Sequence, residues 1–380
     1  MRITRLTIRN LRRLAQVELQ PGPGLNLLVG ENGAGKTSVL EALHLMAYGR
    51  SFRGRVRDGL VRSGAEAVEV FVEWRPAGPG DAGTRRAGLR HAGDRWTGRL
   101  DGADVAQLGD LCAALAVVSF EPGSHALVEG GGEPRRRFMD WGLFHVEHEF
   151  LPAWRRYARA LRQRNALLKA QRPEIELEGW EQEMASAGDE MTRSRSAYLA
   201  RLDRQLAMLV PELSPALGTA ELSFQPGWRR QEVSLADALL LARGRDRQVG
   251  HTTVGPHRAD WRVRVAAAPD GESLSRGQAK LVALSCLLAQ AADLGERHGG
   301  WPVVALDDLA SELDAAHRGR VLALLEKTGA QVFVTGTDWA PLERSQRRAD
   351  AAMFHVEHGR VGSLPAAVQD PATAGPKAPE

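Results

Sequence analysis

Residues 24–49, GLNLLVGENGAGKTSVLEALHLMAYG, decide the fold of this chain. The apolar run Gly24–Gly30 predicts a buried strand, and apolar residues at helical spacing from Lys36 onward predict a helix that stops at Gly49. Between them, Gly30–Thr37 matches the P-loop pattern G-x-x-x-x-G-K-[ST] in the strand, loop and helix context that the pattern requires. We therefore expect an α/β fold that holds a nucleoside triphosphate at this loop.

The loop residues have separate expected roles. Glycines let backbone N–H groups turn inward around the phosphates, and the following helix adds its positive N-terminal end. Lys36 would reach the β- and γ-phosphates, and the Thr37 hydroxyl would bind Mg²⁺. The alternative is a glycine turn that only joins strand to helix. The predicted nucleotide site is Gly30, Glu31, Asn32, Gly33, Ala34, Gly35, Lys36 and Thr37, with ATP and Mg²⁺ as cofactors.

A magnesium nucleotide site also needs a carboxylate, normally at the end of an apolar strand. The segment Trp301–Asp308, WPVVALDD, supplies two. We expect Asp307 to hold Mg²⁺ together with Thr37, as a Walker B aspartate, and Asp308 to act with Lys36 in catalysis as a base or water-orienting group. The alternative is a strand that simply ends in polar turn residues.

Two further segments look like motifs of ATP-binding-cassette (ABC) ATPases. Leu274–Gln278, LSRGQ, resembles their signature motif, and Ser311–Asp314, SELD, resembles their D-loop. Locally, Ser275 with Gln278 is also an ordinary capping box. In the ABC class the signature acts across a dimer, so Ser275, Gly277 and Gln278 would contact the nucleotide of a second copy, with Ser311 and Asp314 in the D-loop.

One position departs from ABC transporters. After the strand Val332–Val334, the sequence is Thr335-Gly336-Thr337-Asp338, where transporters place a switch histidine. We expect hydrolysis to be slow, or Thr337 to make a weaker contact with the γ-phosphate.

The order of the motifs predicts a head that is interrupted by an insertion. Trp154–Ala170 and Trp180–Leu209 have apolar residues at helical spacing and are separated at Arg172-Pro173, so they form a short helical arm. The fold class is therefore an ABC-type α/β ATPase head with an inserted helical arm. The expected parts are residues 1–120 and 251–362 for the head, 121–250 for the arm, and 363–380 for a disordered tail.

Composition limits the environment. The 380 residues are 43% hydrophobic and 26% charged, as in ordinary globular proteins, and the net charge of +3 permits an anionic partner. Cys112 and Cys286, the only cysteines, make neither a disulfide framework nor a zinc site. Basic residues interrupt the apolar runs of the N-terminus, and Leu281–Ala292 is too short for a membrane span. We expect a cytoplasmic protein without a membrane partner.

As a set, the motifs closely resemble the RecF family of bacterial DNA replication and repair proteins, in the structural-maintenance-of-chromosomes (SMC) branch of the ABC class. The resemblance extends to about Val361. Besides the nucleotide motifs, it rests on ITRLTIRNLRRL near the start, GRSFR from Gly49, EPRRRFMDWGLFHVE from Glu133, TTVGPHRADW from Thr252 and the late FHVEHG.

The resemblance implies an ATP-dependent homodimer that binds double-stranded and gapped DNA. It implies a weak, DNA-dependent ATPase, RecR and RecO as partners, and indirect help in placing RecA at single-strand gaps in the SOS response. It also places Arg12 and Arg13 near the nucleotide base.

Basic residues gather in two places. Phosphate backbones need charge without base-reading geometry, so these arginines are candidate DNA contacts, and a solvated, salt-bridged face is the alternative. The candidates are Arg135, Arg136, Arg137, Arg155 and Arg159.

The pentapeptide FHVEH occurs twice, at Phe144–His148 and Phe354–His358. Neither copy has the H-E-x-x-H order of a zinc protease, so we expect structural histidines and no metal other than Mg²⁺. Two other functions remain open: an ATPase subunit of a transporter, whose Walker motifs lie closer together, and a P-loop phosphotransferase or nuclease, which would need further paired carboxylates or a metal cluster.

Overall fold

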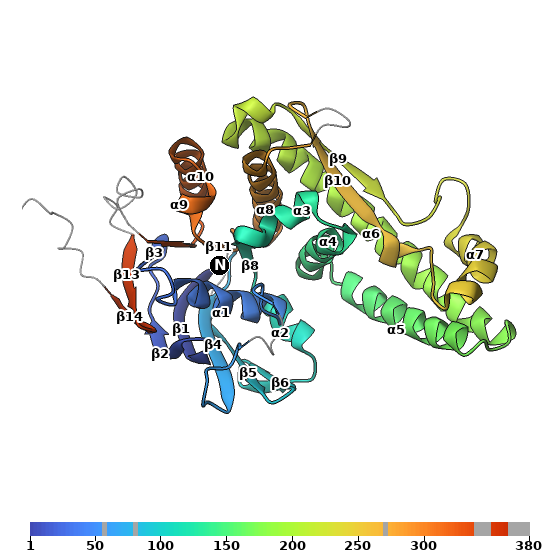
Figure 1. The fold of residues 1–380 in the computed structure, drawn as a ribbon, viewed down its shortest axis with the longest axis horizontal. Helices are drawn as coiled ribbons and strands as arrows, with labels where there is room; N and C mark the ends of the chain where they lie inside the picture. The colour runs from blue at the N-terminus through green and yellow to red at the C-terminus, as the bar shows by residue number, and fades with distance from the viewer. Residues whose placement is uncertain (55–58, 79–82, 269–272, 338–350, 364–380) are drawn as a thin grey trace, which may run out of the picture. The chain divides into compact units, whose positions relative to one another are not determined.

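The computed structural model describes residues 1–54, 59–78, 83–268, 273–337 and 351–363. The chain forms two compact units (Figure 1). Unit 1 comprises Met1–Gly123 and Gly295–Glu380, and unit 2 comprises Ser124–Leu294. The insertion thus extends past the expected boundary at residue 250. The reason is local: Asp260–Val265 pairs antiparallel with Ala220–Gln225, which fixes the segment after residue 250 to the insertion. The predicted tail beyond Ser363 lies outside the described residues.

Unit 1 contains two sheets, each with six strands among the described residues. The antiparallel sheet has the order β2-β1-β4-β5-β6-β7, and the other, mostly parallel, has the order β14-β13-β3-β12-β11-β8. The first is made of β1 Arg2–Leu11, β2 Leu14–Leu19, β4 Ala67–Arg75, β5 Arg85–Ala92, β6 Arg95–Leu100 and β7 Ala103–Val105. The second is made of β3 Leu25–Val29, β8 Val117–Phe120, β11 Val303–Leu306, β12 Val332–Gly336, β13 Ala352–Glu357 and β14 Arg360–Ser363.

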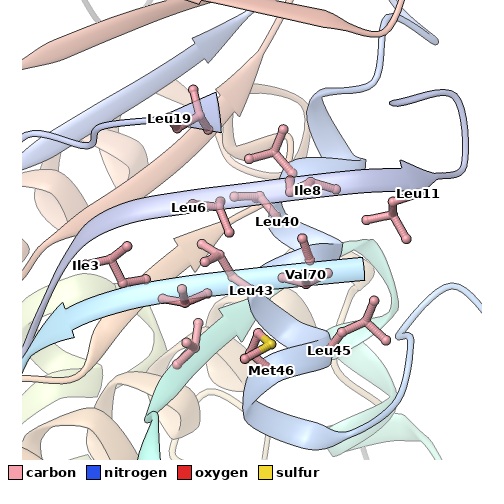
Figure 2. Close-up of a cluster of buried hydrophobic side chains, with 14 of the residues drawn as sticks. Ile3, Leu6, Ile8, Leu11, Leu19, Leu40, Leu43, Leu45, Met46 and Val70 are labelled. Carbon is pink, nitrogen blue, oxygen red and sulfur yellow. The ribbon is translucent and has the colours of Figure 1, made fainter. Parts of the chain in front are cut away.

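The first helix, α1 (Lys36–Tyr48), is the centre of the unit 1 core. Leu40, Leu43 and Met46 of α1 gather with Leu6 and Val70 of the antiparallel sheet (Figure 2). The same cluster also includes residues of the mostly parallel sheet. Because α1 is buried on nearly every side, the run VLEALHLMA is mostly apolar, and its buried polar residues Glu41 and His44 are hydrogen-bonded to Arg12 and Ser119. Among the described residues of unit 1, the other helices are α2 Leu108–Ala114, α9 Leu309–Glu312 and α10 Ala315–Thr328.

Unit 2 is mainly helical, and α5 (Phe150–Lys169) lies beside α6 (Ile175–Leu213). These are the two predicted arm helices, and α6 is longer than its sequence pattern indicated. The other elements are α3 Ala126–Glu129, α4 Gly132–Val146, α7 Leu235–Val249, β9 Ala220–Gln225 and β10 Asp260–Val265. Helix α8 (Arg276–His298) begins in unit 2. The described residues also form the short 3-10 turns η1 Pro122–His125, η2 Pro215–Leu217 and η3 Pro256–Arg258.

No helix among the described ranges is both long enough and apolar enough to cross a membrane.

Unit 2 is fixed internally by a buried charge network. Arg164 of α5 is fully buried, and its Nη1 donates to Asp246 Oδ2 of α7 over 2.7 Å. The same atom donates to Thr252 Oγ1 over 2.8 Å, and Nε donates to Glu181 Oε1 of α6 over 3.1 Å. Thr252 is the first residue of the segment TTVGPHRADW, and Asp246 also accepts from the next residue, Thr253. Helices α5 and α7 therefore both hold this motif.

We predict that Asp246→Ala destabilises the protein strongly, because it leaves the buried Arg164 charge without its closest partner. Breaking a buried pair in this way costs about 3–5 kcal/mol in the free energy of unfolding, measured by urea denaturation. The control is Arg156→Ala, which removes an exposed pair to Glu183 and should cost about 1 kcal/mol or less. Equal losses in the two variants would contradict this account.

Candidate nucleotide-binding site

The predicted P-loop connects β3 to α1 and has the geometry of a phosphate cradle. At Gly30, a Cβ atom would lie 2.0 Å from the Val356 carbonyl oxygen, so no larger residue fits. Gly35, the N-cap of α1, has a φ of 119°, which L-residues rarely adopt. Because glycine has no side chain with which to cap the helix, no side chain covers the amides of Lys36 and Thr37, and they can face an anion.

Lys36 is held inside the loop. It is 8% exposed, and its Nζ donates to the Gly30 carbonyl over 2.5 Å and to the Glu31 carbonyl over 2.9 Å. Burial lowers the pKa of Lys36, while the charges of Asp308 and Asp307 act in the opposite direction. A phosphate in the loop would offer this ammonium group stronger, charged acceptors than two carbonyls.

Two hydroxyls converge on one carboxylate oxygen at the end of β11. Asp307 Oδ1 accepts from Thr37 Oγ1 over 3.0 Å and from Thr335 Oγ1 over 2.7 Å. Asp307 is 3% exposed. Burial raises the pKa of its carboxyl group, and the hydrogen bonds from the two threonines lower it. A hydroxyl and a carboxylate side by side are hard oxygen ligands of the kind that Mg²⁺ prefers, so these residues fit the expected ion.

Thr335 is a site residue that the sequence analysis missed. Its hydroxyl also accepts from the backbone N–H of Asp308 over 2.8 Å. Asp308 is in the left-handed region, with a φ of 50°, and it is the N-cap of α9. One threonine therefore positions the carboxylate of Asp307 and the backbone of Asp308. Thr337 is exposed, and its contact with a γ-phosphate stays a prediction; Asp338 lies outside the described residues.

The two arginines after β1 reach α1 and the P-loop. Arg13 Nη1 donates to the Gly33 carbonyl over 3.1 Å. Arg12 Nη2 donates to Oε1 of the fully buried Glu41 over 2.8 Å, and Ser51 Oγ donates to the same oxygen over 2.5 Å. The segment GRSFR is thereby tied to α1, and Arg13 is the arginine that touches the loop.

The comparisons with known proteins agree with this geometry. The family model described as "RecF/RecN/SMC N terminal domain" matches residues 2–360. The DNA replication and repair protein RecF of Stenotrophomonas maltophilia (strain R551-3) is 62% identical over 96% of this chain and 100% of its own length. That of Thioalkalivibrio sulfidiphilus is 42% identical over 95% of this chain and 100% of its own length. This chain belongs to the RecF family.

Solved structures show the same relation. One described as "Structure of the recombination mediator protein RecF-ATP in RecFOR pathway" is 26% identical, with a TM-score of 0.83, and the match covers 96% of this chain and 97% of that one. Another, of an "SmcHead bound to the C-winged helix domain of ScpA", is 16% identical, with a TM-score of 0.58 over 96% of this chain and 98% of that one. The second likeness shows the fold alone, which is the predicted ABC-type α/β head.

In this RecF-family chain the signature residues form the capping box that the sequence allowed. Gln278 Oε1 accepts from Ser275 N over 2.8 Å, and Ser275 Oγ accepts from Gln278 N over 3.3 Å. Ser275 and Gly277 are exposed at the start of α8. In unit 1, the predicted D-loop begins at the end of α9, where Ser311 is exposed. Asp314 caps α10 by accepting from His317 N over 2.9 Å. That bond is the largest cause that lowers the pKa of Asp314.

The five candidate DNA-contact arginines have different surroundings. Arg135 is only 4% exposed, and its Nε donates to Asp260 Oδ1 over 2.6 Å, so it joins α4 to β10 inside unit 2. Arg136 is half-buried and donates to the Ala259 carbonyl over 2.9 Å. Arg137 and Arg159 are exposed, and Arg155 is half-buried. Arg135 thus has a structural role inside unit 2, and contact of the five arginines with DNA stays a prediction.

The two FHVEH copies differ in structure. His145 is buried in α4 beside Trp141, with ring centroids 4.4 Å apart, and His148 is exposed. His355 and His358 are exposed at β13 and the turn that follows. Across the part of the chain that the structure describes, no three His, Cys, Asp or Glu side chains are grouped as metal ligands.

We predict that Thr335→Val lowers the free energy of unfolding. Valine keeps the shape but leaves the Asp308 N–H without an acceptor and removes one of the two hydroxyls that donate to Asp307 Oδ1, which costs about 1–3 kcal/mol in urea denaturation. Thr335→Ser keeps the hydroxyl and should retain most of the stability. A valine variant as stable as the wild type would show that this hydroxyl positions nothing.

Proposed function

We propose that this chain is an ATP-dependent DNA-binding protein of recombinational repair and replication. In this proposal, ATP and Mg²⁺ close two copies around double-stranded DNA, and slow hydrolysis opens them. The observation that carries the proposal is the convergence of Thr37 and Thr335 on Asp307 beside a P-loop. The RecF structures described as "RecF-ATP" and "RecF-ATPrS" support ATP as the nucleotide.

The residues have distinct roles at the nucleotide. The amides of Gly33–Thr37 and the Lys36 ammonium group would bind the β- and γ-phosphates. Thr37 and Asp307 would hold Mg²⁺, which supplies charge neutralisation for the phosphates when it is bound. Asp308 is half-buried next to this pair, where it can orient or deprotonate a water molecule. The lack of a switch histidine after β12 agrees with weak, DNA-dependent hydrolysis.

In this proposal a dimer is needed because the signature residues of one chain contact the nucleotide of the other. Ser275 and Gly277 are exposed at the N-terminus of α8, a helix of 23 residues, so their polar groups can face the γ-phosphate bound by another copy. Gln278 stays in the capping box and orients Ser275. Ser311 and Asp314 would stand at the same interface. ATP then acts as a clamp between two chains.

The DNA contacts and partners complete the proposal. Arg136, Arg137, Arg155 and Arg159 belong to one unit, and the exposed members, Arg137 and Arg159, are best placed to meet DNA phosphates. Gapped DNA, the partners RecO and RecR, indirect action on RecA, a role in the SOS response and a cytoplasmic location rest on membership of the RecF family.

The test is binding of a labelled duplex by fluorescence anisotropy with a non-hydrolysable ATP analogue, with ADP, or with no nucleotide. We expect tight binding with the analogue, and at least about tenfold weaker binding with ADP or for Lys36→Ala, because only an intact phosphate site closes the clamp. Lys327→Ala, at an exposed lysine of α10, is the control and should bind like the wild type. Duplex binding that ignores both nucleotide and Lys36 would refute the clamp.

A further inference from the structure

One face of the antiparallel sheet in unit 1 carries charged and polar side chains on β1, β4, β5 and β6. Two cross-strand rows are next to each other on this face. One runs through Arg9, Glu69, Arg90 and Thr97, and the other runs through Thr7, Phe71, Gly88 and Arg99. The opposite face of the same strands packs into the core, so these rows are the solvent side of the sheet.

A cavity of about 540 Å³ lies over both rows. Phe71 is half-buried, and its neighbour across the strand pair is a glycine. A Cβ atom at Gly88 would touch only the Phe71 ring, at 4.0 Å, so the missing side chain leaves the space beside that ring open. The floor of the cavity is therefore the Phe71 ring beside the Gly88 backbone, and such a surface is suited to a flat ligand.

The rim of the cavity is basic. Among the described residues that line it, there are four arginines and two carboxylates: Arg5, Arg9, Arg90 and Arg99, with Glu69 and Asp104. Glu69 is shared between Arg9, at 3.7 Å, and Arg90, at 3.3 Å, and Arg5 pairs with Glu18 outside the rim. These pairs are exposed and individually weak, so an incoming phosphate can replace the carboxylates.

We propose that this sheet face binds single-stranded DNA, with one base stacked on Phe71 and the neighbouring phosphates on Arg9, Arg90 and Arg99. The inference rests on the proposed function and deepens it, since a gap places a single strand next to the duplex. Aromatic rings with a basic groove are the usual means of binding single strands without sequence preference. A duplex keeps its bases stacked inside and makes no use of the Phe71 ring. An acidic peptide would match the arginines but also leaves that ring unused.

The test is binding of a fluorescent oligothymidine at low salt by the full chain, without nucleotide. Phe71→Ala removes the stacking ring, and Gly88→Leu fills the cavity from the neighbouring strand. Each should weaken single-strand binding about tenfold, and Phe71→Tyr, which keeps the ring, should bind like the wild type. Arg90→Gln should lower the slope of the binding constant against salt concentration, on a log–log plot, by about one, because it removes one phosphate contact. Melting curves and ATP-dependent duplex binding of each variant show whether the fold and the clamp are intact.

The outcomes separate this inference from the proposed function. Duplex binding that stays ATP-dependent in Phe71→Ala, with single-strand binding lost, supports both. The sheet-face site is overturned if the wild type does not bind single strands. It is also overturned if neither Phe71→Ala nor Phe71→Tyr changes single-strand binding, and in both cases the clamp stands. Polyglutamate that competes as well as the oligonucleotide, with the same need for Phe71, overturns it in favour of an acidic protein partner. If Gly88→Leu does not fold, the two Phe71 variants still decide.

Discussion

The site depends on one buried carboxylate oxygen. Asp307 Oδ1 receives hydroxyls from α1 and from β12, and Asp307 N donates to the Phe120 carbonyl of β8 over 2.8 Å. Burial disfavours the charged carboxylate, so these bonds are what keep it available to a cation. In the proposed site, a carboxylate oxygen that was free to rotate away would no longer hold Mg²⁺ beside Thr37.

The chain topology explains how these distant residues meet. In the mostly parallel sheet, β3, β12, β11 and β8 are neighbours, and the residues after β3, β12 and β11 come out at the same edge. The P-loop follows β3, Asp307 follows β11, and Thr335 is the next-to-last residue of β12. Unit 2 is inserted between β8 and β11, so the signature at Ser275 enters the chain shortly before Asp307.

Local pattern was enough to predict the P-loop, the strand before Asp307 and the two arm helices, because each depends on nearby residues alone. The role of Thr335 could not be predicted, since it arises only when β12 pairs beside β11. A threonine at the end of a buried parallel strand next to a Walker B strand is the signal that could have indicated it. The partner of Arg135 was equally hidden, because Asp260 lies on a strand far along the chain. The insertion extends past residue 250 because β10 pairs with β9, a contact that the sequence pattern does not indicate.

The central claim is that each P-loop is half of a site completed by a second copy. Its most direct test is DNA-stimulated ATP hydrolysis by an equal mixture of Lys36→Ala and Ser275→Arg chains, each of which is inactive alone on this account. Random pairing gives mixed dimers with one intact site, so the mixture should recover about a quarter of the wild-type rate. A mixture that stays as inactive as its components would contradict the account and place the whole nucleotide site within one chain.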